Sequence, residues 1–481
     1  MASELNVLAH ALNLLSERDR RCRDFTLESC RRVLLEVIAS LRCYRTYIGE
    51  RGISEFDRAA ISGAIADAAR RNPLMEASIF SFLQGMLLPA PGLDDARERL
   101  HFTMKFQQLT GPVQAKGVED TTFYRYNVLV SANDVGGHPQ RLGVSPDQFH
   151  RANLDRLSRH PLELIATATH DTKRGEDARA RINAISELPA DWRRSVSEWL
   201  RTNAANRTKI TGMWAPDRND EYLFYQALAG VWPAEPAGAA LPVSASEELA
   251  GRLSRYMQKA VREAKVHTSW IDENQAYGKA VARFVERSLT GRTAARFLAS
   301  FIPVQRRLAH LGMTNSLAQL VLKLASPGVP DFYQGSELWN LDLVDPDNRR
   351  PVDYLLRQQL LDGLEPLLTR VEAGLPAEAE AAELVGAWHD GRIKLFVTAC
   401  GLRFRRLHPE LMLDGGYVPL ACEGPSQEHV VAFMRSHPSC TLLCVVPRLT
   451  ALNPAGNRRG SRCHPRTPTA VLSDTCSPER A

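Results

Sequence analysis

A short apolar run that ends in a histidine and an aspartate is the feature that most constrains this chain. Residues 162–169 (LELIATAT) are mainly apolar and follow a segment with the signals of a helix. Such a run is typical of a strand buried in a parallel sheet, which needs helices on both faces. His170 and Asp171 come directly after it. The sequence therefore predicts an α/β fold with these two side chains at the carboxyl end of a strand.

Helical periodicity dominates the rest of the chain. Apolar residues repeat at three- and four-residue steps in the first part of the sequence, and helical patterns resume over residues 176–324. Residues 145–148 (SPDQ) can form a capping box with proline in the first turn, which predicts a helix start. Just before it, residues 111–143 lack a helical period and predict an ordered loop region.

Changes of pattern divide the chain into four predicted parts. Residues 233–242 are rich in proline, alanine and glycine and predict a loop. From about residue 387 the predicted elements are short: residues 393–407 fit either a helix or a strand, and residues 417–420, 430–434 and 441–446 predict strands. The tail has no aromatic residue, which is typical of disorder. The parts are a helical insertion subdomain (1–110), an α/β domain with a helical insertion at about 176–324 (111–375), a small β-rich domain (376–450) and a disordered tail (451–481).

Composition and charge exclude several classes of protein. The 481 residues are 44% hydrophobic and 24% charged, as in soluble globular proteins. The net charge is only +5 and much of it lies in the tail, so no basic face indicates nucleic-acid binding. No apolar run reaches the ~18 residues of a membrane span, and the cysteines include no Cys-x-x-Cys pair that would favour zinc. We expect a cytoplasmic protein with free thiols, no metal and no cofactor.

The polar residues after the predicted strand form the first candidate site. Catalytic side chains in barrel enzymes lie at the carboxyl ends of strands, where an aspartate can stabilise positive charge and a histidine can bind hydroxyl groups. Lys173 and Arg174 add hydrogen-bond donors, and Glu176 and Asp177 could hold these cations in place. The alternative is an ordinary helix start, in which Asp171 is a cap and the charges are solvated.

Three further groups of polar and aromatic residues are candidate sugar-binding sites. Sugars are bound by planar hydrogen-bonding groups together with aromatic faces, and each group supplies both. The groups are Lys116, Glu119, Asp120 and Tyr124; His267 and Trp270; and Tyr333, Gln334, Glu337, Asp345, Asp347, Asn348 and Arg349. The alternatives are surface salt bridges for the first group, a core tryptophan for the second and an ordinary proline-rich turn for the third.

Four segments, in their order along the chain, resemble the maltooligosyltrehalose synthases of the α-amylase superfamily. They are residues 111–126 (GPVQAKGVEDTTFYRY), 167–181 (TATHDTKRGEDARAR), 262–270 (REAKVHTSW) and 327–353 (PGVPDFYQGSELWNLDLVDPDNRRPVD). The resemblance extends from about Ser3 to Leu449. It implies a (β/α)₈ barrel with helical insertions. It also implies an isomerase of trehalose biosynthesis, which converts the reducing-end α-1,4 linkage of a maltooligosaccharide to an α,α-1,1 linkage by intramolecular transglucosylation.

The same resemblance implies roles for the candidate residues. Asp171, after the seventh barrel strand, would be the family's stabilising aspartate, and His170 would bind a substrate hydroxyl. Residues 326–337 would hold the eighth strand. Lys173, Arg174 and the three further groups would bind the maltooligosaccharide.

The sequence also departs from the family. The family uses an aspartate nucleophile and a glutamate acid/base, which retaining chemistry holds about 5–5.5 Å apart, and no segment before Asp171 matches either one. We therefore expect a partial barrel of about the last two strands, exposed strand edges and a truncated chain that is inactive alone. The alternatives are a non-catalytic glucan-binding remnant, one half of a split enzyme completed by a separate chain, an α-amylase-type hydrolase, and a metal-dependent phosphohydrolase built around His170 and Asp171.

Overall fold

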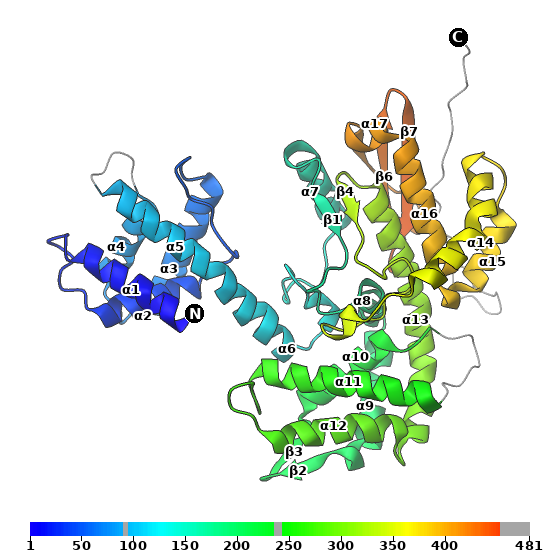
Figure 1. The fold of residues 1–481 in the computed structure, drawn as a ribbon, viewed down its shortest axis with the longest axis horizontal. Coiled ribbons are helices and arrows are strands. Elements are labelled where there is room, and N and C mark those ends of the chain that lie inside the picture. Colours follow the sequence, from blue (N-terminus) through cyan, green and yellow to red (C-terminus); the bar gives the residue numbers. More distant parts are fainter. Residues whose placement is uncertain (90–94, 235–242, 453–481) are drawn as a thin grey trace. The chain divides into compact units, whose positions relative to one another are not determined.

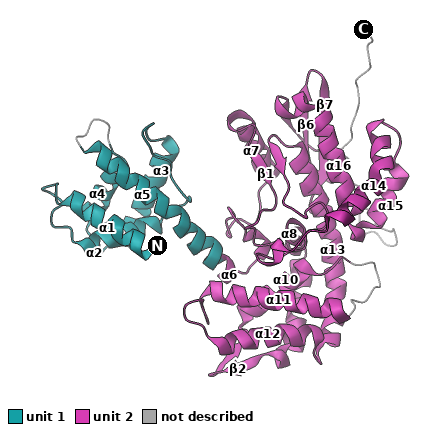
Figure 2. Cartoon of the chain, viewed as in Figure 1, with its two compact units in different colours: residues 1–122 teal, residues 123–481 magenta. Residues whose placement is uncertain are grey.

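The computed structural model describes residues 1–89, 95–234 and 243–452, and most of them are helical. This confirms the prediction of a mostly helical chain with few strands. The chain divides into two compact units, Met1–Thr122 and Phe123–Ala481 (Figure 2). From residue 453 on, the predicted disordered tail lies outside the described residues, as does most of the predicted loop at 233–242. Among the described helices, none combines the length and apolar character that crossing a bilayer requires.

The first unit is a helical bundle with its own apolar core. Its helices are α1 (Ala2–Ser16), α2 (Leu27–Ile38), α3 (Glu55–Arg71), α4 (Ala77–Leu87) and α5 (Ala96–Gln114). Their apolar faces meet at fully buried side chains such as Leu12, Val33 and Leu83. The hydroxyls of Thr26 and Ser54 accept hydrogen bonds from the first turns of α2 and α3, which fixes where these helices begin.

A π-helical segment, η1 (Ala115–Thr122), follows α5 directly. The hydroxyls of Thr121 and Thr122 donate to the carbonyl oxygens five residues earlier, at 2.8 and 2.9 Å, and so support the wide π spacing. The prediction of an irregular region from residue 111 is therefore wrong for residues 111–125, which are helical. Pro112 and the neighbouring glycines hide the helical period in the sequence. π-helical turns are rare and occur frequently at functional sites.

The second unit is built around the long helix α13 (Ala294–Ala325) (Figure 1). The other helices are α6 (Phe123–Arg125), α7 (Pro146–Arg159), α8 (Glu176–Asn183), α9 (Pro189–Thr202), α10 (Arg218–Val231), α11 (Val243–Ala264), α12 (Gln275–Thr290), α14 (Tyr354–Glu372), α15 (Glu378–Gly386), α16 (Arg392–Leu407) and α17 (Pro409–Leu413). Trp199 lies at the centre of an aromatic core, with ring centroids 5.3 Å from Tyr225 and 5.4 Å from Phe301. The predicted capping box at the start of α7 is confirmed, with both of its hydrogen bonds formed.

Two short strands from distant parts of the sequence pair in parallel and position the first candidate site. β1 (Leu164–Ala166) lies beside β4 (Val329–Asp331), with Leu164 opposite Val329 (Figure 1). The predicted strand is therefore present, but its predicted burial is wrong, because Leu164 is 67% exposed. Within the described residues β1 pairs only with β4. Its other edge carries no strand among these residues.

The remaining strands form two antiparallel sheets. β5 (Gly416–Leu420), β6 (Val430–His437) and β7 (Cys440–Pro447) form a meander whose buried Phe433 lies in one core with residues of α13. β2 (Thr208–Ile210) and β3 (Met213–Ala215) form a hairpin inside the region predicted to be helical. Its turn places Thr211 and Gly212 at positive φ, 44° and 91°, which is the backbone geometry of tight hairpin turns.

Candidate functional site

His170 and Asp171 lie in a tight loop between β1 and α8. The loop is fixed by its own threonines: the hydroxyl of Thr172 donates to the carbonyl of Thr169 at 2.9 Å, and the N–H of Asp171 donates to the hydroxyl of Thr169 at 3.3 Å. The side chain of Asp171 is 52% exposed, and the ammonium of Lys173 lies 3.9 Å from it. The carboxylate is therefore free to meet a ligand from solvent, and it does not cap α8, whose N-cap is Gly175.

The loop after β4 meets this His-Asp loop. The side-chain amide of Asn348 donates to the carbonyl of His170 at 3.0 Å, and the hydroxyl of Tyr333 donates to the carbonyl of Asn348 at 3.2 Å. Residues 168–170 and 331–334 line one open hollow of about 420 Å³. Two of the candidate groups predicted from sequence therefore gather at the ends of the paired strands. Gln334 lines the hollow, whereas Glu337 accepts a hydrogen bond from Arg357 at 3.0 Å.

Cations from α11 hold the acidic residues of this second loop. Arg252 donates to both carboxylate oxygens of Asp347, at 2.9 and 2.8 Å, and Lys259 donates to Asp345 at 2.7 Å. Burial would raise the pKa of Asp347, but the hydrogen bonds and charge of Arg252 outweigh it and hold that pKa below its usual value. Arg349 is exposed, 3.9 Å from Asp345. Asp345 and Asp347 thus fix the loop that carries Asn348.

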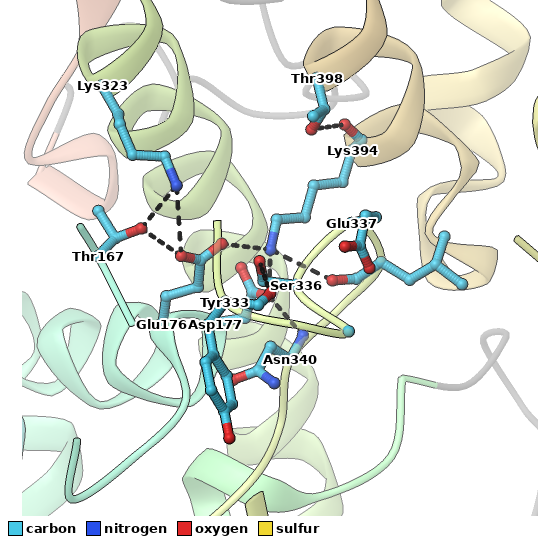
Figure 3. A network of polar contacts seen from close by, with 12 residues as sticks. Thr167, Glu176, Asp177, Lys323, Tyr333, Ser336, Glu337, Asn340, Lys394 and Thr398 are labelled. Carbon is cyan, nitrogen blue, oxygen red and sulfur yellow. Dashed lines mark hydrogen bonds and ion pairs between the residues drawn. The ribbon is translucent and has the colours of Figure 1, made fainter. Parts of the chain in front are cut away.

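The buried charges after Asp171 are paired differently from the prediction. Arg174 is 1% exposed and donates to the carbonyl of Val130 at 3.0 Å and to the hydroxyl of Tyr256 at 2.8 Å. Glu176 and Asp177 do not hold Lys173 and Arg174, so that prediction is wrong. They begin α8 and contact Lys394 of α16, at 2.6 and 2.7 Å (Figure 3). Glu176 also accepts a hydrogen bond from the hydroxyl of Thr167, and Asp177 accepts one from the N–H of Asn340.

His267 and Trp270 lie in the loop between α11 and α12, outside the helices. His267 Nε2 is 2.7 Å from the carboxylate of Asp217, and its ring stacks on Tyr277 with centroids 4.5 Å apart. Trp270 is 57% exposed, with the guanidinium of Arg262 5.1 Å from its ring centroid. The alternative of a core tryptophan is therefore wrong, and the indole remains available to a ligand.

Asp220 joins His267 and Asp217 in the one group of side chains, among the described residues, whose spacing would suit a metal ion. Hydrogen bonds account for this group without an ion. Asp217 caps α10 by accepting from the N–H of Asp220 at 2.8 Å, and Asp220 accepts from the hydroxyl of Tyr277 at 2.5 Å. Burial, reinforced by the charge of Asp217, raises the pKa of Asp220 to about 6.

The group around Lys116 lies on the π-helical segment of the first unit. Lys116 forms an ion pair with Asp120 at 2.5 Å, and Glu119, which is 4% exposed, accepts a hydrogen bond from the hydroxyl of Tyr44. Tyr124 belongs to the second unit, where it is 2% exposed and packs in the main core. Its ring therefore offers no exposed face of the kind that the sugar-binding prediction required.

Sequence reasoning missed the basic residues that surround the strand ends. Arg252 and Lys259 lie on a strongly amphipathic helix, and Lys394 is one cation in a helix that carries several. A charge on a helix face is typical of a solvated surface, so no local signal distinguishes these cations. Only the acidic partners, which follow strand ends, stand out in the sequence.

Comparison with known proteins identifies one class, the maltooligosyltrehalose synthases. The chain has the fold of the maltooligosyltrehalose synthase from Arthrobacter ramosus, with a TM-score of 0.72 and 32% identity, covering 93% of this chain and 50% of that one. The Sulfolobus tokodaii structure described as a hypothetical maltooligosyl trehalose synthase matches with a TM-score of 0.64 and 29% identity. The match covers 92% of this chain and 52% of that one. No protein-family model matches.

A curated relative gives the same result. The Mycobacterium tuberculosis protein named as a maltooligosyl trehalose synthase is 39% identical over 335 residues, which are 69% of this chain and 37% of the relative. The chain is therefore homologous to the maltooligosyltrehalose synthases, and the resemblance predicted from its motifs is confirmed. It spans about half the length of the solved structures and 37% of the curated relative.

Proposed function

We propose that this chain takes part in the conversion of the reducing-end α-1,4 linkage of maltooligosaccharides to an α,α-1,1 linkage. The observation that carries the proposal is the exposed carboxylate of Asp171 at the ends of two parallel strands, beside a hollow lined by His170, Tyr333 and Gln334. This is where barrel enzymes hold their catalytic residues. Homology to the maltooligosyltrehalose synthases supports the reaction type.

Asp171 stabilises the positive charge that develops on the sugar as the glycosidic bond breaks. A preorganised carboxylate is effective in this role, because it does not have to reorganise when the charge appears. His170 binds a neighbouring hydroxyl, and Tyr333 and Gln334 line the sugar site. We propose that Trp270 and Arg349 also contact the maltooligosaccharide. The sugar-binding role of Lys116, Glu119 and Asp120, on the first unit, stays a prediction from the sequence. Lys173, Arg174, Glu337, Asp345, Asp347 and His267 act by holding the loops.

Retaining transfer also needs a nucleophile and an acid/base, about 5–5.5 Å apart. The 481 residues contain no segment that matches these two strand ends in the family. We propose that β1 and β4 are the last two strands of a (β/α)₈ barrel and that catalysis needs strands outside these residues. Those strands would belong either to a longer form of the chain or to a separate polypeptide. The β-rich part of the region predicted at 376–450 is limited to β5, β6 and β7, because α15, α16 and α17 occupy most of residues 378–413.

The test is complementation. The chain is incubated with maltopentaose, and the loss of reducing ends is followed, first alone and then with a polypeptide carrying the strands that precede this region in the Arthrobacter ramosus relative. We expect no product from the chain alone and product from the pair, and we expect Asp171→Asn to abolish the paired activity. Turnover by the chain alone at an ordinary enzymatic rate, about 1–10³ per second, would contradict the incomplete site. Full activity of the variant pair would contradict the role of Asp171.

A glucan-binding role without catalysis is the second candidate. The exposed indole of Trp270, held by Arg262, is the observation that favours it, since aromatic faces cover the C–H surfaces of sugars. Calorimetric titration with maltopentaose separates the two candidates. Binding that depends on Trp270 but not on Asp171, together with no activity in any pairing, would favour the binding role.

A further inference from the structure

We propose that Lys394 is a positioning residue that holds together the two loops at the ends of β1 and β4. It does so through a buried set of charges, the Lys394 network, defined as Thr167, Glu176, Asp177, Lys323, Leu338, Asn340 and Lys394 (Figure 3). The positioning itself is a property of the fold. Its consequence for sugar binding rests on the proposed function.

Every hydrogen that the ammonium of Lys394 can donate has a partner. The side chain is 1% exposed and reaches Glu176 at 2.6 Å, Asp177 at 2.7 Å and the carbonyl of Leu338 at 3.2 Å. Two of these partners begin α8, directly after the His-Asp loop, and the third lies in the loop after β4. One cation from α16 therefore joins two segments that are far apart in the sequence.

The network continues from Glu176 to the ends of both strands. The hydroxyl of Thr167, the residue after β1, donates to Glu176 and itself accepts from Lys323 at 2.9 Å. Lys323 also donates to the carbonyl of Asp331, the last residue of β4, at 3.1 Å. His170 follows Thr167 by three residues, and Tyr333 follows Asp331 by two. The network thus anchors the base of each loop that lines the hollow.

The ion pairs of the Lys394 network are buried, so loss of one charged group leaves its partner uncompensated. Two carboxylates and two ammonium groups, each at most 3% exposed, form a chain of ion pairs from Asp177 through Lys394 and Glu176 to Lys323. Burial alone would raise the pKa of Glu176, but Lys394 and Lys323 lower it to about 2, and the two carboxylates keep the pKa of Lys394 above its usual value. Burial raises the pKa of Asp177, and the charge of Lys394 opposes that shift. Without the ammonium of Lys394, both acidic groups would remain buried, with Lys323 still 3.9 Å from Glu176.

The role in charge balance and the role in positioning can be separated. Lys394→Met removes the ammonium and leaves an excess negative charge. Lys394→Met combined with Asp177→Asn restores the balance of charges but still leaves the carbonyl of Leu338 without its donor. If Lys394 positions the loops, the double variant should regain thermal stability without regaining loop order. If Lys394 is only a structural counter-ion, the double variant should regain thermal stability and loop order together.

The experiment measures hydrogen exchange of the full chain over residues 167–175 and 332–342, together with calorimetric titration of maltopentaose. We expect faster exchange in both segments for the single and the double variant. We expect roughly tenfold weaker binding, as for the loss of a charge-assisted hydrogen bond. Lys394→Arg, which keeps the charge, should recover part of both. Where the single variant does not fold, the double variant and Lys394→Arg supply the same comparison.

Arg435→Lys is the matched control. Arg435 is fully buried and donates to the backbone carbonyls of Gly415 and Gly416 and, at 3.4 Å, to that of Ala325 at the end of α13, but to no member of the Lys394 network. The Arg435→Lys variant should have lower thermal stability but unchanged hydrogen exchange over residues 332–342. Unchanged exchange in Lys394→Met, or full recovery of exchange in the double variant, would overturn the proposal. Failure of the unmodified chain to bind maltopentaose would overturn the sugar site instead, while exchange still decides the positioning role.

Discussion

At the scale of single residues, the acidic side chains around the strand ends divide into two kinds. Asp171 is half exposed, with a lysine ammonium 3.9 Å away, and faces solvent. Glu176 and Asp177 are buried and Asp347 is largely buried, and each accepts close hydrogen bonds from a cation on a helix. A buried carboxylate that accepts several bonds is held in place and has little capacity left for a ligand. Exposure therefore separates the residue proposed for chemistry from those that fix its surroundings.

Asp220 should make the chain less stable as the pH rises toward neutrality. Its folded pKa is raised from 3.8 to about 6, so the native state binds a proton more tightly than the unfolded chain. The stabilisation of the folded state by protonated Asp220 is complete below about pH 4 and is lost as the pH rises through about 6. We expect Asp220→Asn to match the unmodified chain near pH 4 and to be up to about 3 kcal/mol more stable at pH 7, at about 1.4 kcal/mol per pKa unit.

Urea unfolding at several pH values measures the Asp220 effect. Asp155→Asn is the control, because Asp155 is 58% exposed and pairs only with Arg159 among the described side chains. Its substitution should change the free energy of unfolding by less than about 0.5 kcal/mol. A difference between Asp220→Asn and the unmodified chain that stays constant from pH 4 to pH 7 would show that Asp220 does not titrate in this window.

At the scale of elements, local signals decide where helices begin. In α7 the hydroxyl of Ser145 accepts from the N–H of Gln148 at 3.2 Å, and the side chain of Gln148 accepts from the N–H of Ser145 at 2.9 Å. Both bonds are local, so the sequence suffices to predict them. α7 also carries His150, which lies 2.7 Å from the hydroxyl of Tyr417 in β5. This helix thereby links the approach to β1 with the C-terminal sheet.

Ser145→Ala should destabilise the second unit by about 1 kcal/mol, the usual cost of losing an N-cap. The expected readout is a lower urea midpoint with an unchanged slope. Ser158→Ala is the matched control, because Ser158 lies near the end of the same helix and donates only to the carbonyl of Asp155 at 3.0 Å. Its effect should stay within about 0.5 kcal/mol. Equal losses in both variants would mean that the cap does not set the stability of α7.

The elements predicted well are those encoded by local pattern. The strand before His170, the helix start at Ser145 and the helical character of the first unit all follow from neighbouring residues. The hairpin of β2 and β3 was missed, because its short strands lie between long helical patterns. The Lys394 network could not be predicted, since Glu176 and Lys394 are far apart in sequence and nothing local pairs them. Glu176 and Asp177 were assigned to the nearest cations, Lys173 and Arg174, and the fold brings in more distant ones.

At the scale of the whole molecule, the two units differ in how far apart in the sequence their contacting segments lie. The core of the first unit is formed by residues 8–109, which are contiguous apart from loops. In the second unit β1 pairs with β4 across all the helices from α8 to α13, and β7 packs against α13. Loop-closure entropy opposes such distant pairings. The second unit therefore joins segments that lie farther apart in the sequence than those of the first unit.

Separate cores predict separate unfolding transitions. Leu34 is fully buried in the core of the first unit, and Leu228 is fully buried in the main core of the second. Leu34→Ala should cost the first unit about 2–5 kcal/mol through the cavity it leaves, and Leu228→Ala should cost the second unit a similar amount. Scanning calorimetry of the full chain should show each variant lowering a different transition. A single transition that both variants lower equally would show that the two units unfold as one, in spite of their separate cores.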